Sequence, residues 1–182
     1  VNPIQTITTQ PLASQDICRG GTIAPLTVAY TDGVGTATYQ WYSNTTNANT
    51  GGTSISGANG SSYTPPVFNI VGDYYYYAMV SLSGSGCGSV ASATALVRVV
   101  PDPTVTITPS SQTICQNTTP TNLVVTPSGG VGTFSYQWYS NTTNNTTTGT
   151  SLGASATSAT YTPLTTVLGT RYYYCIITQT GL

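Results

Sequence analysis

One stretch of nine residues occurs twice in this chain, first as Tyr39-Gln40-Trp41-Tyr42-Ser43-Asn44-Thr45-Thr46-Asn47. It returns 97 positions later as Tyr136-Gln137-Trp138-Tyr139-Ser140-Asn141-Thr142-Thr143-Asn144. The same spacing relates Ile17-Cys18 to Ile114-Cys115 and Gly33-Val34-Gly35-Thr36 to Gly130-Val131-Gly132-Thr133. A repeat of this length matches one immunoglobulin-sized sandwich, so the sequence predicts one small domain present in two copies.

The distribution of β-forming residues predicts an all-β fold. Short runs rich in Val, Ile, Thr and Tyr are separated by clusters of Gly, Pro and Asn, and no window has helical periodicity. The first copy is expected to form strands at 6–9, 26–30, 38–43, 54–55, 62–64, 73–82 and 89–99. The second copy repeats this order at 105–108, 123–126, 135–140, 151–152, 159–162 and 171–178. We therefore expect tandem immunoglobulin-like β-sandwich repeats.

The expected organisation is a first repeat over 1–101, a Pro-rich linker at 102–103 and a second repeat over 104–182. Pro101 and Pro103 restrict the backbone, which predicts a stiff linker. The second copy has no counterpart of 89–99, and this leaves an open strand edge that proteins normally avoid. The sequence thus predicts a chain that continues into a longer array, or a neighbouring chain that supplies the strand.

Charged residues make up only 4% of the 182 residues, against about 25% in typical soluble proteins. The formal net charge of −1 provides no electrostatic attraction for nucleic acid or an acidic membrane. Lys, Glu and His are absent, which excludes a Ser-His-Asp triad, a Cys-His pair and a Lys Schiff base. The four Asp residues are isolated from one another in the sequence, so we expect no enzyme, no metal site and no cofactor.

Alternation along the strands divides the aromatic residues into two sets. Trp41 and Trp138, together with Tyr76 and Tyr173, are expected in the core. The neighbouring tyrosines then point to the opposite side of the sheet. They are expected to form an exposed contact face of Tyr42, Tyr75 and Tyr77 in the first copy and Tyr139, Tyr172 and Tyr174 in the second. Such a face could stabilise the sheet, pack against another domain or stack on sugar rings.

The cysteines indicate a secreted or surface protein if they are oxidised. Cys18 and Cys87 are expected at one end of the first sandwich, where a disulfide could join them. Cys115 repeats Cys18, so its counterpart partner would lie just past the end of the chain. Cys175 replaces Ala78 and is either a buried thiol or the partner of Cys115.

These motifs together resemble a known family. Ile-Cys, Gly-Val-Gly-Thr, Tyr-Gln-Trp-Tyr-Ser-Asn, Tyr-Thr-Pro, the tyrosine run and Gly-Cys-Gly-Ser-Val are similar to the Ig-like repeats of giant cell-surface adhesins in Bacteroidota. The likeness is greatest to the SprB-like gliding-motility adhesins of flavobacteria, and it covers both copies. It implies a filament that the type IX secretion system exports to the outer membrane and that grips a surface during gliding. Cys175 and the missing final strand of the second copy depart from the pattern.

The resemblance also implies the partners of this segment. They are neighbouring repeats of the same long chain, a surface polysaccharide or an abiotic surface, and the gliding and secretion machinery reached through other parts of the protein. Two other functions compete with this one. The exposed tyrosines would suit a carbohydrate-binding module of a secreted protein, and the open edge would suit a pilin-like subunit completed by donor strands.

Overall fold

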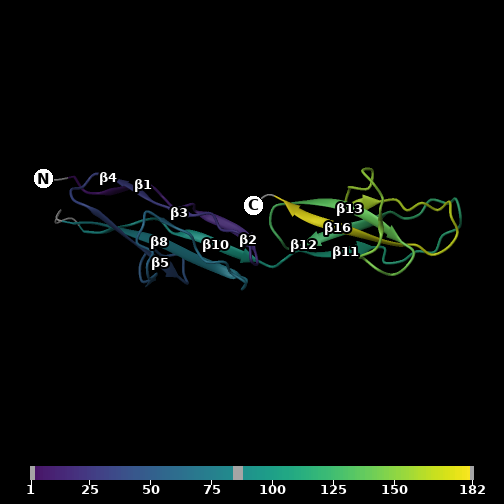
Figure 1. Ribbon diagram of the computed structural model, residues 1–182, viewed down its shortest axis with the longest axis horizontal. Coiled ribbons are helices and arrows are strands. Elements are labelled where there is room, and N and C mark those ends of the chain that lie inside the picture. Colours follow the sequence, from purple (N-terminus) through teal and green to yellow (C-terminus); the bar gives the residue numbers. More distant parts are fainter. Residues whose placement is uncertain (1–2, 84–87, 181–182) are drawn as a thin grey trace. The chain divides into compact units, whose positions relative to one another are not determined.

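The structure is a computed structural model that describes residues 3–83 and 88–180, with the side chain of Thr180 left out. The chain divides into two compact units, Val1–Pro101 and Asp102–Leu182. The described residues form strands and turns with no helix, and therefore no helix that could cross a membrane (Figure 1). Each unit is an immunoglobulin-like β-sandwich, which confirms the predicted fold class.

The first unit packs one large sheet against two short strand pairs. The large sheet has the order β2 (Ser14–Cys18), β10 (Ala95–Val100), β8 (Gly72–Leu82), β5 (Ala37–Asn44) and β6 (Thr53–Ser54), and β9 (Val90–Ala91) also pairs with β8. The short pairs are β1 (Thr6–Thr9) with β4 (Ala29–Thr31), and β3 (Leu26–Thr27) with β7 (Ser62–Tyr63). Trp41, Val80 and Val97 from the large sheet meet Leu26 and Val28 in one core.

The second unit has the same plan with fewer strands. One sheet consists of β11 (Thr104–Thr108), β12 (Leu123–Ser128) and β15 (Thr160–Tyr161). The other consists of β14 (Thr150–Ser151), β13 (Thr133–Asn141) and β16 (Tyr172–Thr180). β13 and β16 pair without interruption, from Thr133 opposite Thr180 to Asn141 opposite Tyr172.

Apart from shifts of one residue at strand ends, the observed strands differ from the expected ones at three places in the first unit. The strand expected at 26–30 is interrupted at Val28, where the chain changes partner from β7 to β1. The strand expected at 89–99 is interrupted at Ser92, whose hydroxyl accepts a hydrogen bond from the amide of Ala78. β2 was not expected, because its sequence has no apolar alternation; it forms by pairing in parallel with β10.

The two cores differ in size because β10 contributes side chains to the first core only. The first unit buries twelve core side chains and the second buries four. β10 contributes Ala95, Val97 and Val99 to the first core. The described part of the second unit has no strand at the corresponding place, so much of its sheet stays half-exposed.

Candidate contact face

The tryptophan of the repeated motif lies in the core of each unit. Trp41 and Trp138 have no exposed surface, and each directs its indole N–H to a backbone carbonyl. Trp41 Nε1 donates to the oxygen of Gly60 at 2.9 Å, and Trp138 Nε1 donates to that of Ser158 at 2.8 Å. Because a buried N–H needs a partner, this bond holds the loop that contains Gly60 in the first unit and the loop that contains Ser158 in the second.

The core tyrosines lie beside these indoles. Tyr76 is 4% exposed and packs against Tyr63, with ring centroids 5.8 Å apart. Tyr173 packs in the same way against Tyr161 at 5.6 Å but is only half-buried. Burial raises the pKa of Tyr76 well above the ordinary tyrosine value, and it raises the pKa of Tyr173 too.

The expected exposed face is instead a stacked and hydrogen-bonded pair of rings in each unit. Tyr42 lies parallel to Tyr77 with centroids 5.0 Å apart, and Tyr139 lies parallel to Tyr174 at 5.1 Å. The backbone N–H of Gly52 donates to the Tyr77 hydroxyl at 3.1 Å. In the second unit the N–H of Gly149 makes the matching bond to Tyr174 at 3.2 Å.

The expectation that Tyr77 belongs to an exposed face is therefore wrong, because its side chain is only 3% exposed. Its side chain does lie on the outer side of the sheet, opposite Tyr42, but the loop before β6 covers it. Asn49 of this loop donates from Nδ2 to the carbonyl of Ser92 at 2.9 Å, which ties the loop to the β9–β10 connection. Alternation along a strand gives the side of the sheet and does not reveal such a covering loop.

The other five tyrosines of the expected face remain partly accessible. Tyr42, Tyr75, Tyr139 and Tyr174 are half-buried, and Tyr172 is 38% exposed. In each stacked pair, one face of each ring is occupied by its partner. The structure thus offers ring edges and partly covered faces in place of the open aromatic platform that was expected.

The polar residues of the motif also bond within their own unit. Gln40 donates from Nε2 to the carbonyls of Trp41 and Ile55, and Gln137 bonds in the same manner to those of Trp138 and Gly153. Asn44 donates from Nδ2 to the carbonyls of Ala48 and Thr50, and so closes the loop after β5; Asn141 closes the corresponding loop after β13. The repeated motif is therefore explained by the stability of the fold.

The cysteines follow only one of the expected alternatives. Cys87 lies outside the described residues, so its pairing with Cys18 stays a prediction. Cys115 and Cys175 are not joined to each other, and both are free thiols. Cys175 lies on β16 opposite Trp138, and burial raises the pKa of its thiol. Of the two alternatives for Cys175, the structure therefore has the free thiol and not the bond to Cys115, because Cys175 lies on the edge strand β16 while Cys115 lies in an exposed loop.

Charged side chains meet at one described place. Arg98 Nε lies 2.9 Å from Asp73 Oδ1, and both side chains are largely exposed. Asp73 raises the pKa of Arg98 through this contact. Nowhere in the described ranges do three His, Cys, Asp or Glu side chains gather as they would around a metal ion.

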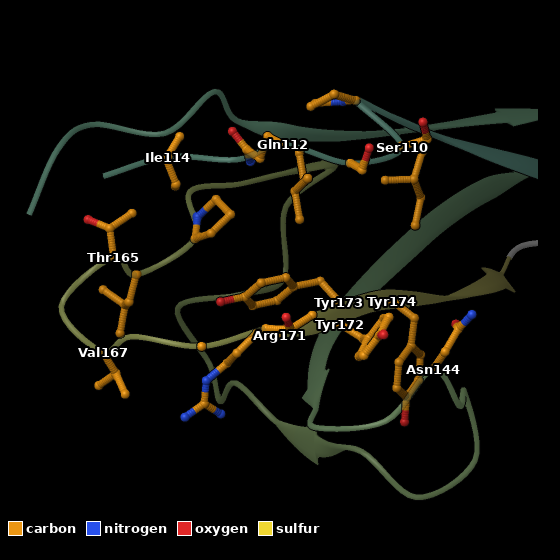
Figure 2. Close-up of a pocket in the computed structure, with 18 of the residues that line it drawn as sticks. Ser110, Gln112, Ile114, Asn144, Thr165, Val167, Arg171, Tyr172, Tyr173 and Tyr174 are labelled. Atoms are coloured by element: carbon orange, nitrogen blue, oxygen red, sulfur yellow. The ribbon is translucent and has the colours of Figure 1, made fainter. Parts of the chain in front are cut away.

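Sequence reasoning missed a groove of about 550 Å³ in the second unit. Gln112 and Ile114 line one wall, and Tyr172 and Tyr173 line another (Figure 2). Cys115 also lines the groove. Three largely exposed apolar residues, Leu164, Val167 and Leu168, also line it. The sequence did carry one indication of this groove. The second copy has no counterpart of 89–99, and a strand without a neighbour leaves space beside it.

Residues 7–101 and 104–181 each match a family that is described as "Domain of unknown function (DUF8696)". The chain belongs to this family and contains two copies of its domain. No curated protein matches the chain.

Several solved structures resemble the chain in fold. The fibronectin(III)-like modules of Clostridium thermocellum CbhA are 19% identical, with a TM-score of 0.39, over 96% of this chain and 85% of that one. Sidekick-1 immunoglobulin domains 1–4 are 16% identical, with a TM-score of 0.43, over 74% of this chain and 34% of that one. The N-terminal eight Ig domains of Down Syndrome Cell Adhesion Molecule are 12% identical, with a TM-score of 0.41, over 91% of this chain and 20% of that one.

Proposed function

We propose that this chain is a repeat segment of a filamentous cell-surface adhesin that supports surface attachment and gliding motility. Its role is structural and adhesive and involves no catalysis. The segment lies outside the cell, associated with the outer membrane through other parts of the protein. Neighbouring repeats are its nearest partners, and a polysaccharide or abiotic surface is what the filament grips.

One observation supports this proposal above the others. In both copies the most similar stretch of sequence bonds inward, to its own unit, through the Trp indole, the Gln and Asn amides and the stacked tyrosines. A repeated sequence whose side chains stabilise their own domain fits a protein in which copies of one domain are joined to make a long chain. The family membership of both copies agrees with such an array.

The tyrosines give less support to the carbohydrate-binding alternative. A sugar ring stacks on an open aromatic face, and the paired rings cover one face of each other in both units. Tyr172 is the most exposed of the six residues, and it has no described ring partner with which to form a platform.

Mechanical stretching tests the structural part of the proposal. A molecule held by its two ends should give two separate rupture events, each releasing about 25–30 nm of chain, because about 80–100 residues extend at up to about 3.5 Å each. A single rupture that releases the whole length at once would contradict an array of independent units.

Cell-surface labelling tests the adhesive part. Monovalent antibody fragments against this chain should bind intact cells of the source organism and reduce both attachment to glass and gliding speed. Fragments against an unrelated surface protein serve as the control. If the chain is reached only after the cells are broken, or if bound fragments leave attachment and gliding unchanged, the proposed function is wrong.

A further inference from the structure

The last strand of the first unit occupies a slot between two other strands. β10 runs parallel to β2, with Leu96 opposite Ser14 and Val100 opposite Cys18. On its other side β10 runs antiparallel to β8, from Ala95 opposite Tyr76 to Val99 opposite Gly72. Ala95, Val97 and Val99 point into the core and are almost completely buried. The slot therefore accepts small apolar side chains at alternate positions.

The described residues of the second unit form both walls of this slot and place no strand between them. Residues 111–115 correspond to β2, and the beginning of β16 corresponds to that of β8. Among the described residues, β16 pairs with β13 alone, and 111–115 form no strand. The groove of about 550 Å³ lies between these two segments (Figure 2).

The apolar side chains of the walls show what the groove lacks. Ile17 of β2 is 2% exposed in the first unit, whereas its counterpart Ile114 is 40% exposed. Tyr76 is buried, whereas its counterpart Tyr173 is half-buried. Two differences between the units contribute to this exposure. No described strand covers these side chains in the second unit, and Thr165 and Arg171 stand where the first unit has the stacked rings of Phe68 and Tyr74.

Hydrogen bonds hold the first wall in the same place in both units. Gln15 brackets Ala24, with Nε2 donating to its carbonyl and Oε1 accepting from its amide. Gln112 brackets Thr121 through the same two bonds, each 3.0 Å long. The wall of the second unit is thus already positioned although no strand pairs with it.

Beside the end of the slot where β10 leaves it, a backbone hydrogen bond is the same in both units. The amide of Gly20 donates to the carbonyl of Phe68 at 2.8 Å, and the amide of Asn117, at the corresponding position, donates to that of Thr165 at 3.1 Å. The second unit therefore keeps the shape of a slot that a strand would otherwise have to create on entry.

We propose that this groove is an acceptor site for a β-strand of the same kind as Ala95–Val100. The strand lies parallel to 111–115 and antiparallel to the start of β16, and it directs small apolar side chains inward at every second position. Backbone hydrogen bonds to the two walls give it affinity, and the apolar side chains over Tyr173 and Ile114 give it specificity. The occupant is thus a peptide strand and not a sugar.

A synthetic peptide tests this proposal on the whole 182-residue chain under reducing conditions. The peptide has the sequence of residues 93–101, and hydrogen exchange of the backbone amides is measured by NMR. Binding should slow exchange by at least about tenfold at 111–115 and at 172–174. The amides of β2 and β8 should not change, because β10 already fills the slot of the first unit. A matched peptide with both Val97→Asn and Val99→Asn should bind at least about tenfold more weakly, because burying a valine favours binding by more than that factor.

Two protein variants separate the groove from general apolar adhesion. Ile114→Asn changes a groove wall, and Val105→Asn changes a residue of β11 that is similarly exposed at 42% and lies outside the groove. Both variants should fold, since both positions face solvent in the free chain. Only Ile114→Asn should weaken binding of the peptide, by about tenfold.

The register of the bound strand can be read with the thiol of Cys115. Val100 lies opposite Cys18 in the first unit, so position 100 of the peptide should lie next to Cys115. In a peptide with Val100→Cys, activated as a mixed disulfide with thiopyridine, the Cys115 thiolate should attack the sulfur of the peptide cysteine, so that a disulfide joins the peptide to Cys115 and thiopyridone is released. The matched Leu96→Cys peptide, whose cysteine would lie opposite Ser111, should react at least about tenfold more slowly.

Three results would overturn the proposal. The first is the absence of amide protection at millimolar peptide. The second is binding that is equal for the valine and asparagine peptides, or equal for the two protein variants. The third is protection of 172–174 that rises with protein concentration in the absence of peptide, because a second copy would then cover the edge itself. The proposed adhesin role does not enter any of these measurements.

Discussion

Replacing Gly52 by Ala should damage the stacked tyrosine pair of the first unit. A methyl group added at Gly52 would lie 2.7 Å from the carbonyl oxygen of Ser43 and 2.8 Å from Cε1 of Tyr77. Side-chain carbons do not approach other atoms within 3.0 Å, so the loop or the ring must move. Movement of the loop also breaks the bond from the Gly52 amide to the Tyr77 hydroxyl. The same change therefore removes packing and a hydrogen bond together.

The expected loss of stability is about 2 kcal/mol. Overpacking a filled site costs about 1–3 kcal/mol, and losing one hydrogen bond costs about 0.5–1.5 kcal/mol. The alanine also reduces the freedom of the unfolded chain, which returns about 0.4–1 kcal/mol. A net loss of about 2 kcal/mol lowers the folding equilibrium constant of the first unit about 30-fold.

The two indole N–H groups provide a separate NMR signal for each unit. Urea titration of the Trp41 signal follows the first unit, and the Trp138 signal serves as an internal reference in the second. Gly60→Ala is the matched control, because its added methyl would meet no atom closer than 3.4 Å. Its effect should stay within about 0.5 kcal/mol.

A double-mutant cycle identifies the cause. In a Tyr77→Ala background the clash with the ring and the hydrogen bond are already absent and only the contact with the Ser43 carbonyl oxygen is left, so Gly52→Ala should cost about 1 kcal/mol less. Gly149→Ala should reproduce the effect in the second unit, where the added methyl would lie 2.5 Å from Cε1 of Tyr174. A clash at Gly52 is contradicted if Gly52→Ala costs no more than Gly60→Ala, and a clash with the ring is contradicted if the cost is unchanged without Tyr77.

Three further predictions concern the remaining features. Calorimetry should show two transitions with the second unit melting first, because it buries four core side chains against twelve; the opposite order, assigned from the indole signals, would contradict this. Burial raises the folded-state pKa of Tyr76 and Tyr173, so their contribution to stability is complete below the ordinary tyrosine value of about 10. Stability should therefore fall as the pH rises past 10 toward the raised pKa values, and a urea midpoint that stays constant up to pH 11 would be against it. At pH 8 a thiol reagent should modify Cys115 faster than Cys175, because Cys115 is exposed while burial raises the pKa of the Cys175 thiol; equal rates would contradict the structure.

Most strands could be predicted from the sequence because they alternate. β1 was predicted with its observed bounds, and β5 and β8 to within one residue at each end. β2 could not be predicted, since its residues, Ser14–Cys18, become a strand only through a partner about 80 residues away. The break at Ser92 also depends on a contact with a distant strand, because the Ser92 hydroxyl accepts the hydrogen bond of the Ala78 amide that a backbone carbonyl would otherwise accept.

The candidate face was only partly predictable. Alternation places Tyr42 and Tyr77 on one side of the sheet, and the observed pairing agrees. Whether that side is open depends on a loop that closes through Asn44 and attaches to Ser92. Neither contact leaves a periodic signal in the sequence, so the burial of Tyr77 was missed.

The sequence by itself determined that one domain is present twice and that each copy is a β-sandwich around a tryptophan. These properties follow from periodicity and repetition, which are local and can be read along the chain. The tertiary structure alone decided which tyrosines are covered, that Cys115 and Cys175 stay apart, and that the described residues of the second unit form a positioned slot without placing a strand in it. These properties depend on contacts between distant segments, and such contacts are fixed only when the sheets have paired and the loops have closed over them.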